Sequence, residues 1–262
     1  MKKGYIETRQ GQVHYRADGE TGPYLFLLHL TPFSSRMFEL ALPWLGRHCR
    51  AIALDTPGYG NSDPPPAPIS ITDYGERVLE AIDRITSGPF ALCGFSTGAA
   101  IALEIARRVS ARTNRLILST TPVMTKDELK ALVTANVGEP EMAPDGSHFL
   151  RAWRGRQGIW GADFDMRYLH LATADIANVY DRYHWGLIAV ASCNVHALLA
   201  DARCPTLFLS GGSETHAHYN ESAAAMVDGA RFELIPGVSE PICLTAPEAF
   251  ADKVARFVVG RA

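Results

Sequence analysis

The sequence predicts an α/β fold with a mostly parallel, doubly wound sheet, and three observations indicate it. Short apolar runs typical of buried strands alternate with longer segments of helical periodicity in the first and last parts of the chain. A Gly-x-Ser-x-Gly stretch at residues 94–98 separates one such run from a helix. From Pro122 to about Ala200 the strand pattern stops, which indicates a helical segment inserted between strands.

The elements before this insertion come in the order that parallel strands joined by helices require. Strands are expected, from their apolar residues and flanking turn residues, at Gly11–Arg16, Tyr24–His29, Cys49–Asp55, Pro89–Cys93 and Leu116–Thr120. Helices are expected at Ser35–Leu45, Ile71–Ile85 and Ala99–Val109. The stretch from Asp55 to Pro66 is rich in Gly and Pro, which predicts a series of turns.

We expect the insertion to form a helical cap over residues 122–200, and residues 1–121 and 201–262 to form one core domain. The cap has helical patterns with many aromatic side chains, among them Phe149, Trp153, Trp160, Tyr168, Tyr180, Tyr183 and Trp185. After the cap, strands are expected at Pro205–Ser210 and Ala230–Ile235, and a closing helix at Pro247–Val259.

Composition and charge narrow the classes of function. Of the 262 residues 47% are hydrophobic, enough for a substantial core, and the net charge of −3 comes without basic runs. No apolar run reaches the length of a membrane span. We therefore expect a cytoplasmic protein that binds a small-molecule substrate, with no nucleic-acid or membrane partner. Whether it forms a homo-oligomer stays open.

The sequence has no pattern that indicates a cofactor or a metal. Its five cysteines are scattered without Cys-x-x-Cys spacing, which is typical of reduced thiols rather than of a metal site. Gly58-x-Gly60 lies in a proline-rich turn, and not between a strand and a helix as a dinucleotide-binding loop would. We expect neither a cofactor nor a metal.

Residues Gly94-Phe95-Ser96-Thr97-Gly98 have the context of a nucleophile elbow. They lie between a predicted buried strand and a predicted helix, where small flanking residues permit a strained turn that exposes the serine hydroxyl. The serine would also lie at a helix N-terminus, beside backbone N–H groups without intrahelical acceptors. This context predicts that Ser96 is a nucleophile rather than an ordinary turn serine.

Three ordered motifs carry a resemblance to a known family: residues 27–32 (Leu-Leu-His-Leu-Thr-Pro), residues 55–62 (Asp-Thr-Pro-Gly-Tyr-Gly-Asn-Ser) and the elbow. With them the chain resembles the α/β-hydrolase superfamily, in its branch with a helical cap. The resemblance implies acyl transfer by Ser96, with the backbone N–H groups of Thr97 and Thr31 as an oxyanion hole. His29 is implied to be structural, and Leu30 follows it where the family usually has glycine.

The resemblance also implies where the other two members of a catalytic triad lie. The acid aligns with Glu214, just after a predicted strand. The family's histidine follows Pro-Gly-x-x, which here is Pro236-Gly237-Val238-Ser239, and the residue that follows is Glu240. Pro247, seven residues later, fits the start of the closing helix and fixes the same alignment. The expected site is therefore Ser96, Glu214 and Glu240, with two carboxyl groups that share a proton.

Several mechanisms remain open for such a site. Glu240 could act as the general base for Ser96 in ester, amide or carbon–carbon cleavage, as in the serine-carboxyl peptidases that the pairing resembles. Another histidine could supply the base, and the candidates are His216 and His218 after Glu214 and His148, His170 and His184 in the cap. Alternatively, Glu240 could transfer a proton in a lyase or isomerase, or the chain could be a ligand-binding pseudoenzyme.

Overall fold

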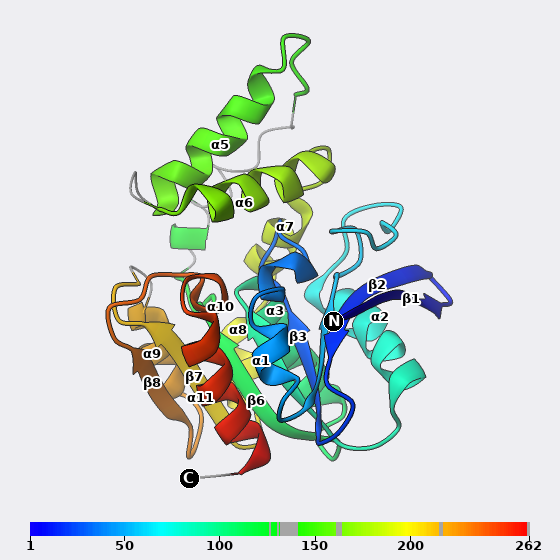
Figure 1. Cartoon of the computed structure of the whole chain (residues 1–262), viewed down its shortest axis with the longest axis vertical. Helices are drawn as coiled ribbons and strands as arrows, with labels where there is room; N and C mark the ends of the chain where they lie inside the picture. The colour runs from blue at the N-terminus through cyan, green and yellow to red at the C-terminus, as the bar shows by residue number, and fades with distance from the viewer. Residues whose placement is uncertain (126, 130, 132–140, 161–163, 215–216, 261–262) are drawn as a thin grey trace.

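The computed structural model describes residues 1–125, 127–129, 131, 141–160, 164–214 and 217–260. Within these residues eight strands form one sheet in the order β1-β2-β4-β3-β5-β6-β7-β8 (Figure 1). The strands are β1 (Lys2–Thr8), β2 (Gly11–Asp18), β3 (Tyr24–Leu28), β4 (Arg50–Leu54), β5 (Phe90–Phe95), β6 (Thr113–Ser119), β7 (Thr206–Gly211) and β8 (Arg231–Ile235). β1 and β2 pair antiparallel, as do β2 and β4, and every later pair is parallel. The predicted mostly parallel sheet is confirmed.

The two faces of the sheet pack against separate hydrophobic clusters, because neighbouring residues of a strand point to opposite faces. On β3, Phe26 and Leu28 belong to one cluster and Leu25 and Leu27 to the other. The first cluster includes residues of α2 (Ile71–Ile85), α3 (Thr97–Arg108) and α9 (Ala217–Ala224). The second includes residues of the 3-10 helix η1 (Ser35–Phe38), α1 (Leu42–Leu45), α10 (Ile242–Thr245) and α11 (Pro247–Val259). Helices on both faces make the sheet doubly wound, as predicted.

Two parts of the N-terminal region differ from the prediction. β1 was not expected, because its side chains are mostly polar and only Ile6 is buried. The helix expected over Ser35–Leu45 is wrong as one element, since the chain forms η1 and then α1. Pro43 lacks an N–H and is tolerated only in the first turn of a helix, so a new helix begins beside it at Leu42.

The described residues between β6 and β7 contain helices and no strand. They form α5 (Ser147–Trp160), α6 (Met166–Asn178), α7 (Trp185–Ala191) and α8 (Val195–Ala200). α5 and α6 lie together beyond the sheet, at the top of the view in Figure 1. α7 and α8 instead add buried residues such as Val190 and Leu199 to the cluster around α3. No helix in the described part of the chain is long and apolar enough to cross a membrane.

Candidate active site

Ser96 occupies a strained turn between β5 and α3. Its backbone has φ 49° and ψ −112°, a conformation that costs a residue with a side chain about 1–3 kcal/mol. The Ser96 N–H donates to the carbonyl of Ser119 at the end of β6 (3.0 Å), and the Ser96 carbonyl accepts from Ala99 N–H (2.8 Å) and Ala100 N–H (3.1 Å). These bonds hold the turn, and Ser96 lines a cavity beside it.

The two glycines of the motif are required by close packing of backbone on backbone. A Cβ atom on Gly94 would collide with the carbonyl oxygen of Gly98, and one on Gly98 would collide with the carbonyl oxygen of Leu28 in β3. Because α3 approaches β3 and β5 this closely, only glycine fits at either position. Glycine is therefore required on both sides of Ser96 because α3 begins in close contact with β3 and β5.

A cavity of about 210 Å³ lies over the elbow. Its polar side chains include Ser96, Thr31, Arg156, His184 and Glu240. Most of its wall is apolar, with contributions from Leu30, Pro32, Met124, Ile159, Trp160 and Leu187. The volume is below the range of about 300–1,000 Å³ that is typical of pockets for drug-sized ligands. The cavity therefore suits a small, largely apolar compound.

Thr31 and Thr97 meet beside Ser96. Their hydroxyl oxygens lie 2.8 Å apart, so the loop after β3 is joined to the first residue of α3. The Thr97 N–H is in the first turn of α3, where backbone donors have no intrahelical acceptor. Gly186 of α7 packs so closely on Thr31 that a Cβ there would lie 2.6 Å from its methyl carbon. The role of these threonines as oxyanion donors stays a prediction.

The carboxyl groups of Glu214 and Glu240 are neighbours, although Glu240 alone of the two lines the cavity. Glu214 is buried and accepts hydrogen bonds from Gly211 N–H (3.0 Å) and the Thr120 hydroxyl (3.2 Å). Burial, the charge of Glu240 and a hydrogen bond between the two carboxyls raise the pKa of Glu214 to about 7, against the effect of the two donors. Glu214 therefore keeps its proton up to about neutral pH.

The alternative histidine bases differ in position. His184 lines the same cavity as Ser96, and burial lowers its pKa. His148 is buried against the rings of Phe149 and Tyr180, whereas His170 and His218 are exposed. His216 lies outside the described residues. Of the described candidates, His184 is therefore the one placed to exchange a proton in the cavity.

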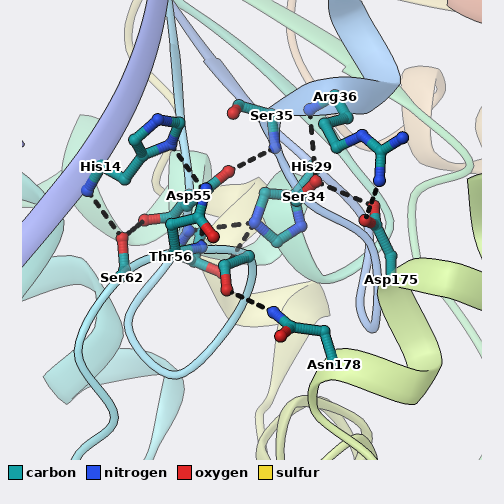
Figure 2. Close-up of polar contacts among 12 residues, drawn as sticks. His14, His29, Ser34, Ser35, Arg36, Asp55, Thr56, Ser62, Asp175 and Asn178 are labelled. Carbon is teal, nitrogen blue, oxygen red and sulfur yellow. Dashed lines mark hydrogen bonds and ion pairs between the residues drawn. The ribbon is translucent and has the colours of Figure 1, made fainter. Parts of the chain in front are cut away.

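His29 has the hydrogen bonds of a structural residue. Its Nδ1 donates to the carbonyl of Leu30 (2.9 Å), and its Nε2 accepts from the Thr56 N–H (3.0 Å). Burial lowers the pKa of His29, which keeps this ring neutral. Figure 2 shows it beside Asp55, whose carboxylate accepts from the ring of His14 (2.8 Å) and from backbone N–H groups. This network fixes the loops that follow β3 and β4 below the cavity.

Helix α6 is attached to these same loops by polar contacts (Figure 2). The Ser34 hydroxyl donates to the buried carboxylate of Asp175 (2.8 Å), and the Arg36 guanidinium lies 3.4 Å from that carboxylate. Asn178 donates to the carbonyl of Gly60 (2.7 Å). Burial raises the pKa of Asp175 to about 6, although Ser34 and Arg36 favour its charged form. These contacts hold α6 against the loops that follow β3 and β4.

Sequence reasoning did not identify Arg156, which lines the cavity from α5. Nothing in the local sequence separates it from Arg151 and Arg154 on the same helix. Only the folding of α5 over the elbow brings Arg156 to the site. Among the described residues, His, Cys, Asp and Glu side chains nowhere gather in a group of three or more that could hold a metal ion.

Comparison with known proteins identifies relatives along nearly the whole chain. A family model described as the alpha/beta hydrolase family matches residues 25–253. The chain is 27% identical over 252 residues to a pimeloyl-[acyl-carrier protein] methyl ester esterase of Nitrosospira multiformis. The matched region covers 90% of this chain and 94% of that protein. A hydrolase from Pseudomonas aeruginosa superposes with a TM-score of 0.83 at 24% identity over 98% of both chains. An enol-lactonase from Burkholderia xenovorans superposes with a TM-score of 0.78 at 22% identity over 97% of this chain and 99% of that chain. These superpositions show the same fold.

Proposed function

The chain belongs to the α/β-hydrolase family, and on that premise we propose that it hydrolyses a small, largely apolar carbonyl compound through Ser96. One observation carries this proposal: the strained serine and a carboxylate, Glu240, line one small apolar cavity at the strand ends. An ester, an amide or a carbon–carbon bond next to a carbonyl would suit the site, and an ester is the simplest substrate for a test.

In the proposed reaction, the Ser96 oxygen attacks the carbonyl carbon while its proton passes to the Glu240 carboxylate. The negative charge that develops on the carbonyl oxygen is stabilised by the N–H groups of Thr97 and Thr31. The protonated Glu240 then returns the proton to the leaving alcohol, which departs and leaves an acyl group on Ser96. Water, deprotonated by Glu240, then attacks the acyl group, and Glu240 returns the proton to the Ser96 oxygen as it leaves, so that ester and water yield acid and alcohol.

Glu214 acts in this proposal as a positioning residue for Glu240. A pKa of about 7 keeps Glu214 protonated over much of the pH range in which a carboxylate base works. The protonated Glu214 can then donate a hydrogen bond to the Glu240 carboxylate and fix the orientation of Glu240. A carboxylate is a weaker base than imidazole, and slower turnover near neutral pH is therefore expected than with histidine in that position.

The test is hydrolysis of 4-nitrophenyl esters from acetate to octanoate at pH 4 to 9. Wild-type enzyme should favour the short chains, and Ser96→Ala and Glu240→Gln should each lose at least about 1,000-fold in kcat/KM. Glu221→Gln is the matched control, because this glutamate of α9 is exposed. Turnover that survives in Ser96→Ala, or is absent at every pH, would contradict hydrolysis by this serine and favour proton transfer by Glu240 or a pseudoenzyme.

His184 provides a second route for the proton, because it lines the same cavity and its lowered pKa keeps the imidazole neutral. If His184 is the base, then His184→Gln should abolish hydrolysis and Glu240→Gln should leave it largely intact. Our proposal predicts the reverse order of effects. The variant Glu240→His adds a complementary readout, since a large gain in ester hydrolysis would mean that the carboxylate limits the reaction.

A further inference from the structure

Arg156 provides a positive charge inside the cavity that the proposed reaction does not use. The residue lies on α5 and lines the cavity together with Ser96 and Glu240. Within the described ranges its guanidinium forms no hydrogen bond or ion pair, in contrast to Arg151 and Arg167, which donate to nearby oxygens. Five N–H donors of a guanidinium are therefore available on one wall of a small cavity.

The surroundings of Arg156 disfavour a cation that has no partner. The cavity wall is mostly apolar, and burial lowers the pKa of Arg156, while Tyr183 and Glu240 act in the opposite direction. The Arg156 side chain is half-buried, and a cation beside apolar groups is stabilised by an anion that hydrogen-bonds to it. Glu240 lines the same cavity and favours the charged form of Arg156.

The position of Arg156 relative to Ser96 indicates what would complete the site. A substrate whose carbonyl lies at Ser96 has its other end within the same small cavity, and Arg156 is on its wall. A planar guanidinium matches a carboxylate with two parallel hydrogen bonds. The limited volume favours a compact carboxylate over a bulkier anionic group. Resting on the function proposed above, we propose that the substrate is a carbonyl compound with a free carboxylate, which Arg156 binds.

The test compares two chromogenic substrates that differ only in this charge. They are the mono-4-nitrophenyl ester of glutaric acid and the methyl ester of the same compound, assayed at pH 7. Wild-type enzyme should show at least about tenfold higher kcat/KM for the acid. Arg156→Met should reduce the ratio of the two kcat/KM values about 10- to 100-fold, the range expected for a charged hydrogen-bonded pair. Salt at 0.5 M should lower the wild-type ratio.

Two further variants control the interpretation. Arg154→Met removes an exposed arginine two residues away and should leave the ratio unchanged. Arg156→Lys keeps the charge without the planar pair of donors, and should retain part of the preference. If Arg156→Met lowers both rates by the same factor, or the wild type prefers the neutral ester or neither, then Arg156 does not bind a substrate carboxylate and the inference is wrong.

A binding measurement separates this inference from the proposed hydrolysis. Monomethyl glutarate and dimethyl glutarate are titrated calorimetrically into Ser96→Ala. Binding of the acid alone, and its loss in Ser96→Ala with Arg156→Met, would support the anion site even if the wild type hydrolysed neither nitrophenyl ester. Hydrolysis of both esters at equal rates, with no selective binding of the acid, would leave the proposed function intact and overturn the anion site.

Discussion

Replacing Glu214 by glutamine should remove a large part of the pH dependence of the protein's stability. The pKa of Glu214 rises from 4.5 to about 7 in the folded chain, so the folded state holds this proton more tightly than the unfolded state. The contribution of Glu214 is fully present below pH 4.5 and is lost as the pH rises through about 7. At 1.36 kcal/mol per pKa unit, the free energy of unfolding falls by up to about 3 kcal/mol over this range.

Glutamine stays neutral and can donate to Glu240 as the protonated carboxyl does. The free energy of unfolding of Glu214→Gln, from urea titrations at pH 5, 6, 7 and 8, should therefore rise relative to wild type with increasing pH, by about 2–3 kcal/mol in total. Glu221→Gln, on the exposed side of α9, should follow the wild-type curve. Parallel curves for wild type and Glu214→Gln would refute the raised pKa of Glu214 in the folded chain.

Three other substitutions, the first with a control variant, test how the site is built. Gly98→Ala brings a Cβ against the carbonyl oxygen of Leu28 and should lower the free energy of unfolding in urea by at least about 2 kcal/mol. In the control Gly155→Ala in α5 the Cβ meets no atom within 4 Å, so the free energy of unfolding should be unchanged or rise by up to about 1 kcal/mol. Equal effects of the two variants would contradict the packing argument. Gly186→Ala should displace Thr31 and lower kcat more than it raises KM for a nitrophenyl ester, and unchanged kcat would separate Thr31 from the reaction. Ser34→Ala removes a hydrogen-bond donor from the buried Asp175 carboxylate and should lower the free energy of unfolding by about 1–3 kcal/mol at pH 8. The loss should be smaller at pH 5, because Asp175, with a pKa of about 6, is then protonated. A loss that does not depend on pH would be inconsistent with this contact.

The core elements could be predicted because local chemistry marks them. The helix expected at Ile71–Ile85 has these bounds in the structure, since Ser70 and Asp73 form a capping box at its start. The closing helix likewise begins at Pro247, where proline is favoured in the first turn. The proximity of Glu214 and Glu240 follows from topology, because each comes shortly after one of the adjacent parallel strands β7 and β8.

The rest depends on contacts that local sequence does not encode. β1 is held by its pairing with β2, and its own residues have little apolar pattern. Arg156 differs from Arg154 only in which side of α5 faces the cavity, a property set by how α5 and α6 pack together. The position of His184 in the cavity similarly requires the start of α7 to pack against the loop after β3, where Gly186 meets Thr31.

The central claim is that Ser96 takes up the acyl group while Glu240 removes its proton. The most direct measurement is mass spectrometry of the protein quenched within milliseconds of mixing with a 4-nitrophenyl ester, with the modified peptide sequenced. Our account predicts an acyl group on Ser96 in the wild type, its formation at least about 1,000-fold slower in Glu240→Gln, and near-normal formation in His184→Gln. Acylation elsewhere, or at the wild-type rate in Glu240→Gln, would contradict it.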